Sequence, residues 1–202
     1  MLPNSIGYYS LIFGLIVSLM IIFLSIKNFK NSLILDNKIK IFLIIQLILV
    51  FVSFFSLIVS FIISDFSNET VFNNSHTTKP LFYKITGTWG SHEGSLLLWL
   101  LVLTLFIFIF LIKTKNQLKN YRLLTVIFQQ IIIFGFFIFL IKTSNPFNNI
   151  FPVPVEGLGL NPILQDPALA IHPPILYLGY VGTSIIFSSV LAATTLNYVD
   201  NN

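Results

Sequence analysis

Five long stretches without a charged residue or a histidine decide what this chain can fold into. Each stretch holds 17 to 23 residues. An α-helix rises ~1.5 Å per residue, so roughly 20 residues cross ~30 Å of bilayer hydrocarbon. The stretches lack the alternating pattern of barrel strands, and only helices or closed barrels satisfy the backbone inside a membrane. The sequence therefore predicts an all-α integral membrane protein with five transmembrane helices, near residues 8–26, 41–63, 96–112, 123–141 and 175–196.

The composition agrees with this fold class and excludes several functions. Hydrophobic residues make up 55% of the chain and charged residues 9%, whereas a soluble domain carries about 25% charged residues. The chain has no cysteine, which excludes disulfides, thiolate metal sites, thiol catalysis and covalent haem attachment to this chain. Uncharged spans also argue against an ion or proton transporter, which normally needs ionisable groups within the membrane. No small-residue cleavage site follows the first stretch, so we expect it to remain as a span.

The distribution of basic residues predicts the topology. The short connections 27–40 and 113–122 carry eight of the 11 lysines and arginines, and the long loops 64–95 and 142–174 carry three. The positive-inside rule places the short connections on the cytoplasmic or matrix side. The N-terminus and both long loops would then face the periplasm or intermembrane space. We expect one membrane domain, 1–202, whose two long loops carry the function, because long loops between short spans often do.

The first loop ends in a distinctive motif, Trp89-Gly90-Ser91-His92-Glu93-Gly94-Ser95. Residue types alone favour an interfacial anchor, with the indole of Trp89 at the membrane surface and Ser91 or Ser95 capping the next helix. His92 and Glu93 offer a second interpretation, because they could bind a metal or an anionic group. One His-Glu pair is weak support for such a site.

The second loop ends in Asn161-Pro162-Ile163-Leu164-Gln165-Asp166-Pro167, followed by His172-Pro173-Pro174 and Tyr177. A residue before proline is pushed to extended geometry, and proline is favoured in the first turn of a helix. We therefore expect His172 just before the fifth span, held rigidly at the outer membrane surface. An imidazole there can ligate haem iron, and a local cap or hydrogen bond explains the spacing equally well. His76, in a polar stretch, is expected to be solvated without a role.

Both motifs, continued through Leu96–Trp99 and Ile175–Gly182, closely resemble the CcmF/NrfE family, the haem lyase subunit of the multi-component cytochrome c maturation system. Asp65-Phe66 and Ser144–Phe147 extend the likeness over nearly the whole chain. The resemblance implies a subunit of a haem lyase complex that helps attach haem covalently to apocytochrome c at the outer membrane face. It implies a subunit that does not act alone and contributes no catalytic residue of its own.

The resemblance also assigns residues. His172 matches the first of two outer-face histidines that ligate the haem iron, and no other metal site is implied. The tryptophan-rich segment, the second outer histidine and two intramembrane histidines for a b-type haem lie further along in full-length members. The chain therefore resembles one fragment of a split lyase, as some mitochondrial genomes encode, and would share its haem with partner chains. The residues expected to support His172 are Trp89, His92, Glu93, Asp166, Pro173, Pro174 and Tyr177.

Partners and location follow from the same resemblance. The expected partners are the remaining lyase fragments with the tryptophan-rich segment, a haem chaperone and apocytochrome c, without nucleic acid. Abundant phenylalanine, 22 residues, indicates an AT-rich genome, which favours the mitochondrial inner membrane with the loops facing the intermembrane space. The bacterial plasma membrane is the alternative location. The alternative function is a structural membrane subunit of a respiratory complex, which would bind no haem and need no particular residue at His172.

Overall fold

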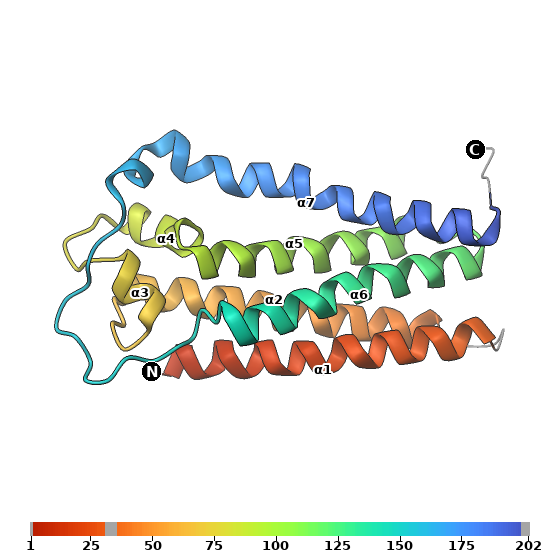
Figure 1. The fold of residues 1–202 in the computed structure, drawn as a ribbon, viewed down its shortest axis with the longest axis horizontal. Coiled ribbons are helices and arrows are strands. Elements are labelled where there is room, and N and C mark those ends of the chain that lie inside the picture. Colours follow the sequence, from red (N-terminus) through yellow and green to blue (C-terminus); the bar gives the residue numbers. More distant parts are fainter. Residues whose placement is uncertain (1, 31–35, 199–202) are drawn as a thin grey trace.

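Five long helices account for most of residues 2–30 and 36–198, the part of the chain that the computed structural model describes (Figure 1). They are α1 (Leu2–Lys30), α2 (Asp36–Ile62), α5 (His92–Lys113), α6 (Lys119–Thr143) and α7 (Pro167–Leu196). Two short helices and one 3-10 helix lie between them: α3 (Glu69–Asn74), α4 (Leu81–Gly90) and η1 (Pro162–Gln165). Each long helix is long and apolar enough to cross a membrane. The prediction of an all-α membrane protein with five spans is confirmed.

The predicted ends of the spans are less accurate than their number. The apolar runs 96–112 and 123–141 lie inside longer helices, and α7 begins eight residues before the predicted start at 175. The end of α2 differs little from the prediction, because the helix stops at Ile62, one residue before the predicted end at residue 63. Helices continue into polar flanks where caps are available: the Ser91 hydroxyl accepts a hydrogen bond from the Gly94 amide at 3.1 Å and starts α5. Hydrophobicity marks where a helix can be buried in lipid, whereas caps mark where it ends.

Helices α1, α2, α5 and α6 form a bundle, and α7 packs on its side against α5 and α6 (Figure 1). Aromatic rings fill the gaps that glycines leave in α1. A Cβ atom at Gly14 would lie 2.7 Å from the ring of Phe137, and one at Gly7 would lie 2.3 Å from the ring of Phe147. Small residues of this kind let transmembrane helices approach closely. Substitution by larger residues at these two positions would push the rings out of the interface.

Two consecutive glutamines of α6 link this helix to its neighbours through hydrogen bonds inside the bundle. Gln130 and Gln46 of α2 exchange amide hydrogen bonds of 2.8 and 3.2 Å, and the Ser18 hydroxyl of α1 donates to Gln130 Oε1 at 2.8 Å. All three side chains are fully buried. Gln129 faces the other way and accepts a hydrogen bond from Ser188 of α7 at 2.8 Å. An unpaired amide in hydrocarbon is costly, so these contacts fix which faces of α1, α2, α6 and α7 meet.

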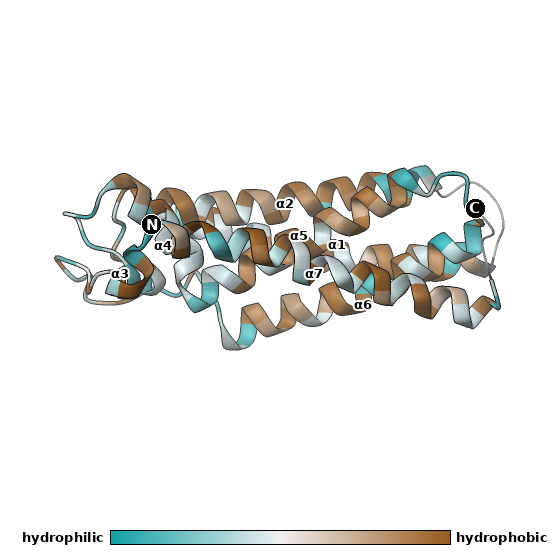
Figure 2. Cartoon of the chain, turned by 90° about the horizontal axis from the view of Figure 1, so that it is seen from above, coloured by the Kyte–Doolittle hydropathy of each residue, from teal (hydrophilic) through white to brown (hydrophobic). Residues whose placement is uncertain are grey.

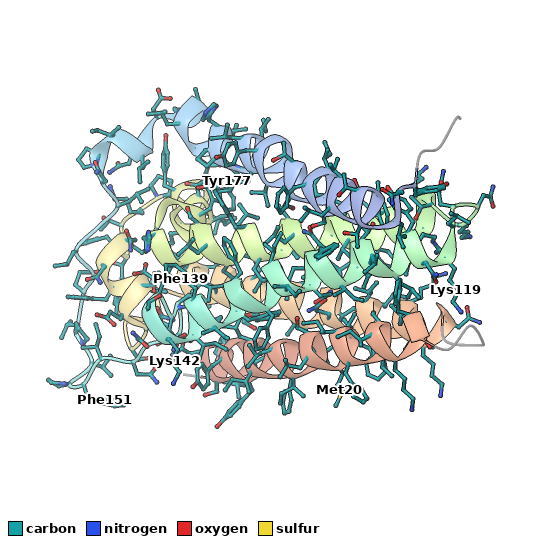
Figure 3. All side chains as sticks on the ribbon, turned by 45° about the vertical axis from the view of Figure 1, so that its right-hand side comes forward. Met20, Lys119, Phe139, Lys142, Phe151 and Tyr177 are labelled. Carbon is teal, nitrogen blue, oxygen red and sulfur yellow. The ribbon has the colours of Figure 1, made fainter. Side chains whose placement is uncertain are left out.

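Polar residues gather at the two ends of the bundle (Figure 2). The start of α1, the short helices α3 and α4, η1 and the start of α7 share one end, and the connection from α5 to α6 lies at the other (Figure 1). Lys142 and Lys119, at the two ends of α6, mark these opposite ends (Figure 3). Both long loops therefore lie at one end of the bundle, here called the outer end, and the side of the membrane that this end faces stays a prediction.

The side assigned to each end is testable, because the chain has no native cysteine. A cysteine at exposed Asn73, in α3, should react with a membrane-impermeant thiol reagent added to the periplasmic or intermembrane-space side. The matched control is a cysteine at exposed Asn116, between α5 and α6, which should react only after the inner side is opened. The reverse pattern of labelling would contradict the assigned orientation.

Candidate functional site

His172 lies inside α7 rather than before it. The helix begins at Pro167, and Asp166 caps it by accepting hydrogen bonds from the amides of Ala168 at 2.9 Å and Leu169 at 3.0 Å. The expectation that His172 precedes the helix is therefore wrong. An aspartate cap followed by proline at the first position is a strong start signal, and it sets the helix start ahead of the later prolines. His172 occupies the second turn with its imidazole exposed to the surroundings.

Two prolines that follow His172 would normally weaken this helix. Pro173 and Pro174 have no amide hydrogen, so the carbonyls of Leu169 and Ala170 lose their helical donors four residues on. The indole Nε1 of Trp89 donates to the Ala170 carbonyl at 2.7 Å. The first motif thus replaces a helical hydrogen bond that the second motif cannot make. The predicted interfacial anchor, Trp89, is bonded directly to the helix that carries His172.

A pocket of about 210 Å³ lies beside this contact, between α4, α5, η1 and α7. Trp89, Ser95, Pro173 and Tyr177 are among its lining residues. The Tyr177 hydroxyl donates to Ser95 Oγ at 3.3 Å, and Ser95 Oγ donates to the Trp89 carbonyl at 2.6 Å. Tyr177 lies near the outer end of the bundle, on α7 (Figure 3). The structure therefore brings Trp89, Pro173 and Tyr177 together, as members of one packed junction.

An aromatic cluster holds the next turns of α7 in place. The ring of Trp99 on α5 stacks on Phe136 of α6 with centroids 5.7 Å apart, and it meets Tyr177 edge-on at 5.5 Å and Tyr180 at 6.0 Å. Aromatic pairs at such distances contribute roughly 0.5–1.5 kcal/mol beyond their buried area. Tyr177 and Tyr180 of α7 are thus linked through Trp99 to α5 and α6.

His92 and Glu93 lie apart from the junction that contains Tyr177. They are the first two residues of α5, where His92 is exposed and Glu93 half-buried. His92 Nε2 lies 3.3 Å from Ser144 Oγ at the end of α6, and neither His92 nor His172 lines the pocket of Trp89 and Tyr177. No group of three or more His, Asp or Glu side chains that could hold a metal occurs among the described residues.

Asparagines that the sequence did not single out fasten the two outer loops to α1. Asn68 donates to the Pro146 carbonyl at 2.9 Å and to the side-chain oxygen of Asn4. Asn4 donates in turn to the Phe147 carbonyl at 3.0 Å. Backbone bonds from Glu69 to Asn148 and from Ile150 to Ser67, each 2.9 Å, complete the junction. Loops 64–95 and 142–174 therefore form one connected structure at the outer end.

A second tie between the loops is formed by Glu156. Its carboxylate accepts hydrogen bonds from the Thr77 hydroxyl at 2.5 Å and the Thr77 amide at 3.0 Å, and His76 Nδ1 lies 3.8 Å away. The Thr77 hydroxyl and amide bonds are the main reasons why the pKa of Glu156 falls to about 2. His76, expected to be solvated without a role, is only partly exposed and also accepts a hydrogen bond from the Thr78 amide at 3.3 Å. It belongs to this loop contact.

Residues 89–201 match the family described as "Cytochrome C assembly protein". The chain belongs to this family. It is 44% identical over 153 residues to the cytochrome c-type biogenesis protein CycK of Rhizobium meliloti, covering 76% of this chain and 23% of that protein. It is 37% identical over 201 residues to the cytochrome c-type biogenesis protein CcmF of Haemophilus influenzae, covering 97% and 31%. The chain thus spans less than a third of the length of these relatives.

A solved structure, "Cytochrome c Heme Lyase CcmF", has the same fold, with a TM-score of 0.82 and 23% sequence identity over 98% of this chain and 31% of that one. The family match begins at Trp89 and therefore contains both motifs and every residue expected to act at the site. Membership of the cytochrome c assembly protein family confirms the resemblance seen in the motifs. The roles of individual residues remain predictions.

Trp89→Phe tests the bond between the two motifs. The change keeps an aromatic ring but removes the indole N–H, which leaves the buried carbonyl of Ala170 without a donor, at a cost of about 1–2 kcal/mol. Hydrogen exchange of the amides in 167–176 should then become ~10-fold faster. Trp99→Phe is the matched control, because the Trp99 N–H donates to no residue that the structure describes. Equal acceleration at 167–176 in both variants would show that ring size, not the hydrogen bond, holds the start of α7.

The Glu156 contact predicts a pH dependence. Because the pKa in the folded protein, about 2, lies below the model-compound value of 4.5, the contact stabilises the loops above about pH 4.5 and is lost as the pH falls toward 2. Carbon-13 NMR of the Glu156 carboxyl should show this low titration. Thr77→Ala should move the pKa upward toward 4.5, whereas Thr78→Ala, whose hydroxyl contacts His76, should move it less. An unchanged midpoint in Thr77→Ala would refute the assigned cause.

Proposed function

We propose that this protein is a subunit of a haem lyase complex, and that it helps attach haem covalently to apocytochrome c at the outer membrane face. The observation that carries the proposal is the exposed imidazole of His172 on a helix start that two family motifs hold in place. The cytochrome c-type biogenesis proteins that it resembles support the same function. The chain spans less than a third of the length of these relatives, and the complete activity is proposed for the whole haem lyase complex.

His172 would supply one axial ligand to the haem iron. Ile175 and Leu176, three and four residues further along the helix, are 63% and 48% exposed, and residues at this spacing share a helix face with His172. An exposed imidazole above an apolar strip suits a haem, whose macrocycle is apolar and whose iron accepts histidine nitrogen. Haem, when bound, supplies the vinyl groups that react with the thiols of apocytochrome c. This chain would hold the iron and leave the thiol chemistry to partners.

The supporting residues divide into two groups. Trp89, Asp166, Pro173, Pro174 and Tyr177 set the start, the direction and the packing of α7, and we propose that they orient His172. His92 and Glu93 stand at the start of α5, where exposed His92 contacts Ser144 rather than the α7 junction. This separation favours docking of the haem chaperone over direct support of the iron ligand. No residue of this chain is proposed to be catalytic.

Partners and location complete the proposal. The second haem ligand and the tryptophan-rich segment would come from partner chains, and apocytochrome c and a haem chaperone would approach from the outer end. The residue composition supports the mitochondrial inner membrane, with the loops facing the intermembrane space. The relatives named above are bacterial, which supports the alternative of the bacterial plasma membrane.

A structural subunit of a respiratory complex is the alternative function. Such a subunit would need the packed bundle and the fastened outer loops but no histidine at 172. The cytochrome c biogenesis proteins among the relatives do not favour this alternative.

His172→Ala tests the haem ligand in the purified complex. The variant should lose outer-face haem by roughly ten-fold or more and stop cytochrome c maturation, with assembly of the membrane complex unchanged. Added imidazole should restore part of the haem, because it can occupy the vacated ligand position. Haem content is measured by the spectrum of the complex, and c-type cytochromes by haem staining. His76→Ala is the matched control for loss of an outer-end histidine; it should keep both haem and maturation. Normal haem and normal maturation in His172→Ala would rule out the ligand assignment.

A further inference from the structure

The inner end of the bundle contains a basic pocket that the proposed haem function does not use. It has a volume of about 260 Å³ and lies where the start of α2, the end of α5 and the start of α6 meet. Lys40 of α2, Lys115 of the α5–α6 connection and Arg122 of α6 line it. Its other described lining residues are Asn37, Leu111 and Ile112, so no carboxylate side chain is among them. Three cations from three segments of the chain converge on one cavity.

The structure holds the central cation firmly. Arg122 is 6% exposed, and its Nη2 donates to the Leu111 carbonyl at 3.0 Å. Leu111 lies in the last turn of α5, whose carbonyls have no helical donor and carry partial negative charge. Arg122 therefore caps α5 while it lines the pocket. Lys40 is half-buried, and Lys115 is exposed at the mouth.

The position of the pocket indicates what it could bind. Lys113 ends α5 and Lys119 begins α6, so the pocket lies at the level where the spans leave the hydrocarbon. Its wall combines these cations with the apolar side chains of Leu111 and Ile112. A phosphate group with attached acyl chains matches both parts of this wall, whereas a free phosphate ion would use only the cations. The inner connections carry eight basic residues against one acid, Asp36, which favours an anionic ligand.

We propose that this pocket binds the phosphate headgroup of an anionic phospholipid of the inner leaflet. The lipid phosphate pairs with Lys40, Lys115 and Arg122, and its acyl chains lie along the apolar wall. Basic pockets between transmembrane helices on the inner side are typical sites for such headgroups. One lipid there would tie α2, α5 and α6 together at the end of the bundle farthest from the outer loops. The proposal is independent of haem binding at His172.

The test compares two double variants of the full 202-residue chain, purified from membranes with its bound partners. Lys40→Gln with Lys115→Gln removes two pocket cations, and Lys113→Gln with Lys119→Gln removes two cations at the same end that do not line the pocket. Glutamine removes the charge and keeps a helix propensity close to that of lysine. Arg122 stays in place because it also caps α5. Binding of phosphatidylglycerol, phosphatidylcholine and inorganic phosphate is measured by native mass spectrometry and by lipid-dependent thermal stability.

We expect the unchanged chain to bind phosphatidylglycerol more tightly than phosphatidylcholine. The pocket variant should bind phosphatidylglycerol at least ~10-fold more weakly, and the control variant should lose less than ~3-fold. An equal loss of phosphatidylglycerol affinity in both variants would show that the lipid is attracted by the general positive charge of the inner face, and would overturn the proposed site. Equal binding of phosphatidylglycerol and phosphatidylcholine to the unchanged chain would also overturn the proposal. Inorganic phosphate that displaces phosphatidylglycerol at equal concentration would identify a free-anion site and overturn the lipid assignment.

Discussion

The absence of water inside the bilayer is the constraint on which the rest of this structure depends. Every backbone amide and every buried side-chain amide within the spans needs a partner from the protein itself. The backbone meets this demand with helices, and Gln129 and Gln130 meet it by pairing with neighbouring helices. Ionisable groups have no comparable solution in uncharged spans, so they lie at the two ends. The fold therefore separates a packed, chemically inert middle from an outer end that carries the motifs and an inner end that carries the cations.

The same constraint explains why the two motifs occur together. Prolines at 173 and 174 restrict α7 just after His172, but they leave the carbonyls of Leu169 and Ala170 without helical donors, and Ala170 is buried. Trp89 supplies a donor from α4, 81 residues away in sequence. The anchor interpretation of the first motif and the functional interpretation of the second are therefore compatible. Trp89 hydrogen-bonds to the start of the helix that carries the candidate ligand, so an anchoring residue of the first motif supports the second.

The sequence predicted the features that local chemistry controls and missed those that depend on contacts between distant segments. Five spans follow from apolar runs, because burial in lipid requires them wherever they occur. The predicted position of His172 is wrong because Pro173 and Pro174 indicate a later helix start, whereas the Asp166 cap starts the helix at Pro167. The sequence does not predict that Gln46 pairs with Gln130 or that Thr77 pairs with Glu156. The residues next to each of these side chains carry no pattern that identifies its distant partner. Thr77 and Glu156 are 79 residues apart.

Helix α7 is the least buried span, and this bears on how a haem could be held. In its most apolar stretch 17% of residues are buried, against 39% in each of the other four spans. Trp99 of α5 and Gln129 of α6 hold one side of α7, and its exposed residues include His172, Ile175 and Leu176. This exposed side is where His172 would hold haem and where a partner chain would pack. Haem held jointly by His172 and a partner chain would make haem binding and assembly of the complex interdependent: each would stabilise the other by the same coupling free energy. A loosely packed helix with a firmly held start is suited to that arrangement, because its ligand is positioned before the partner arrives.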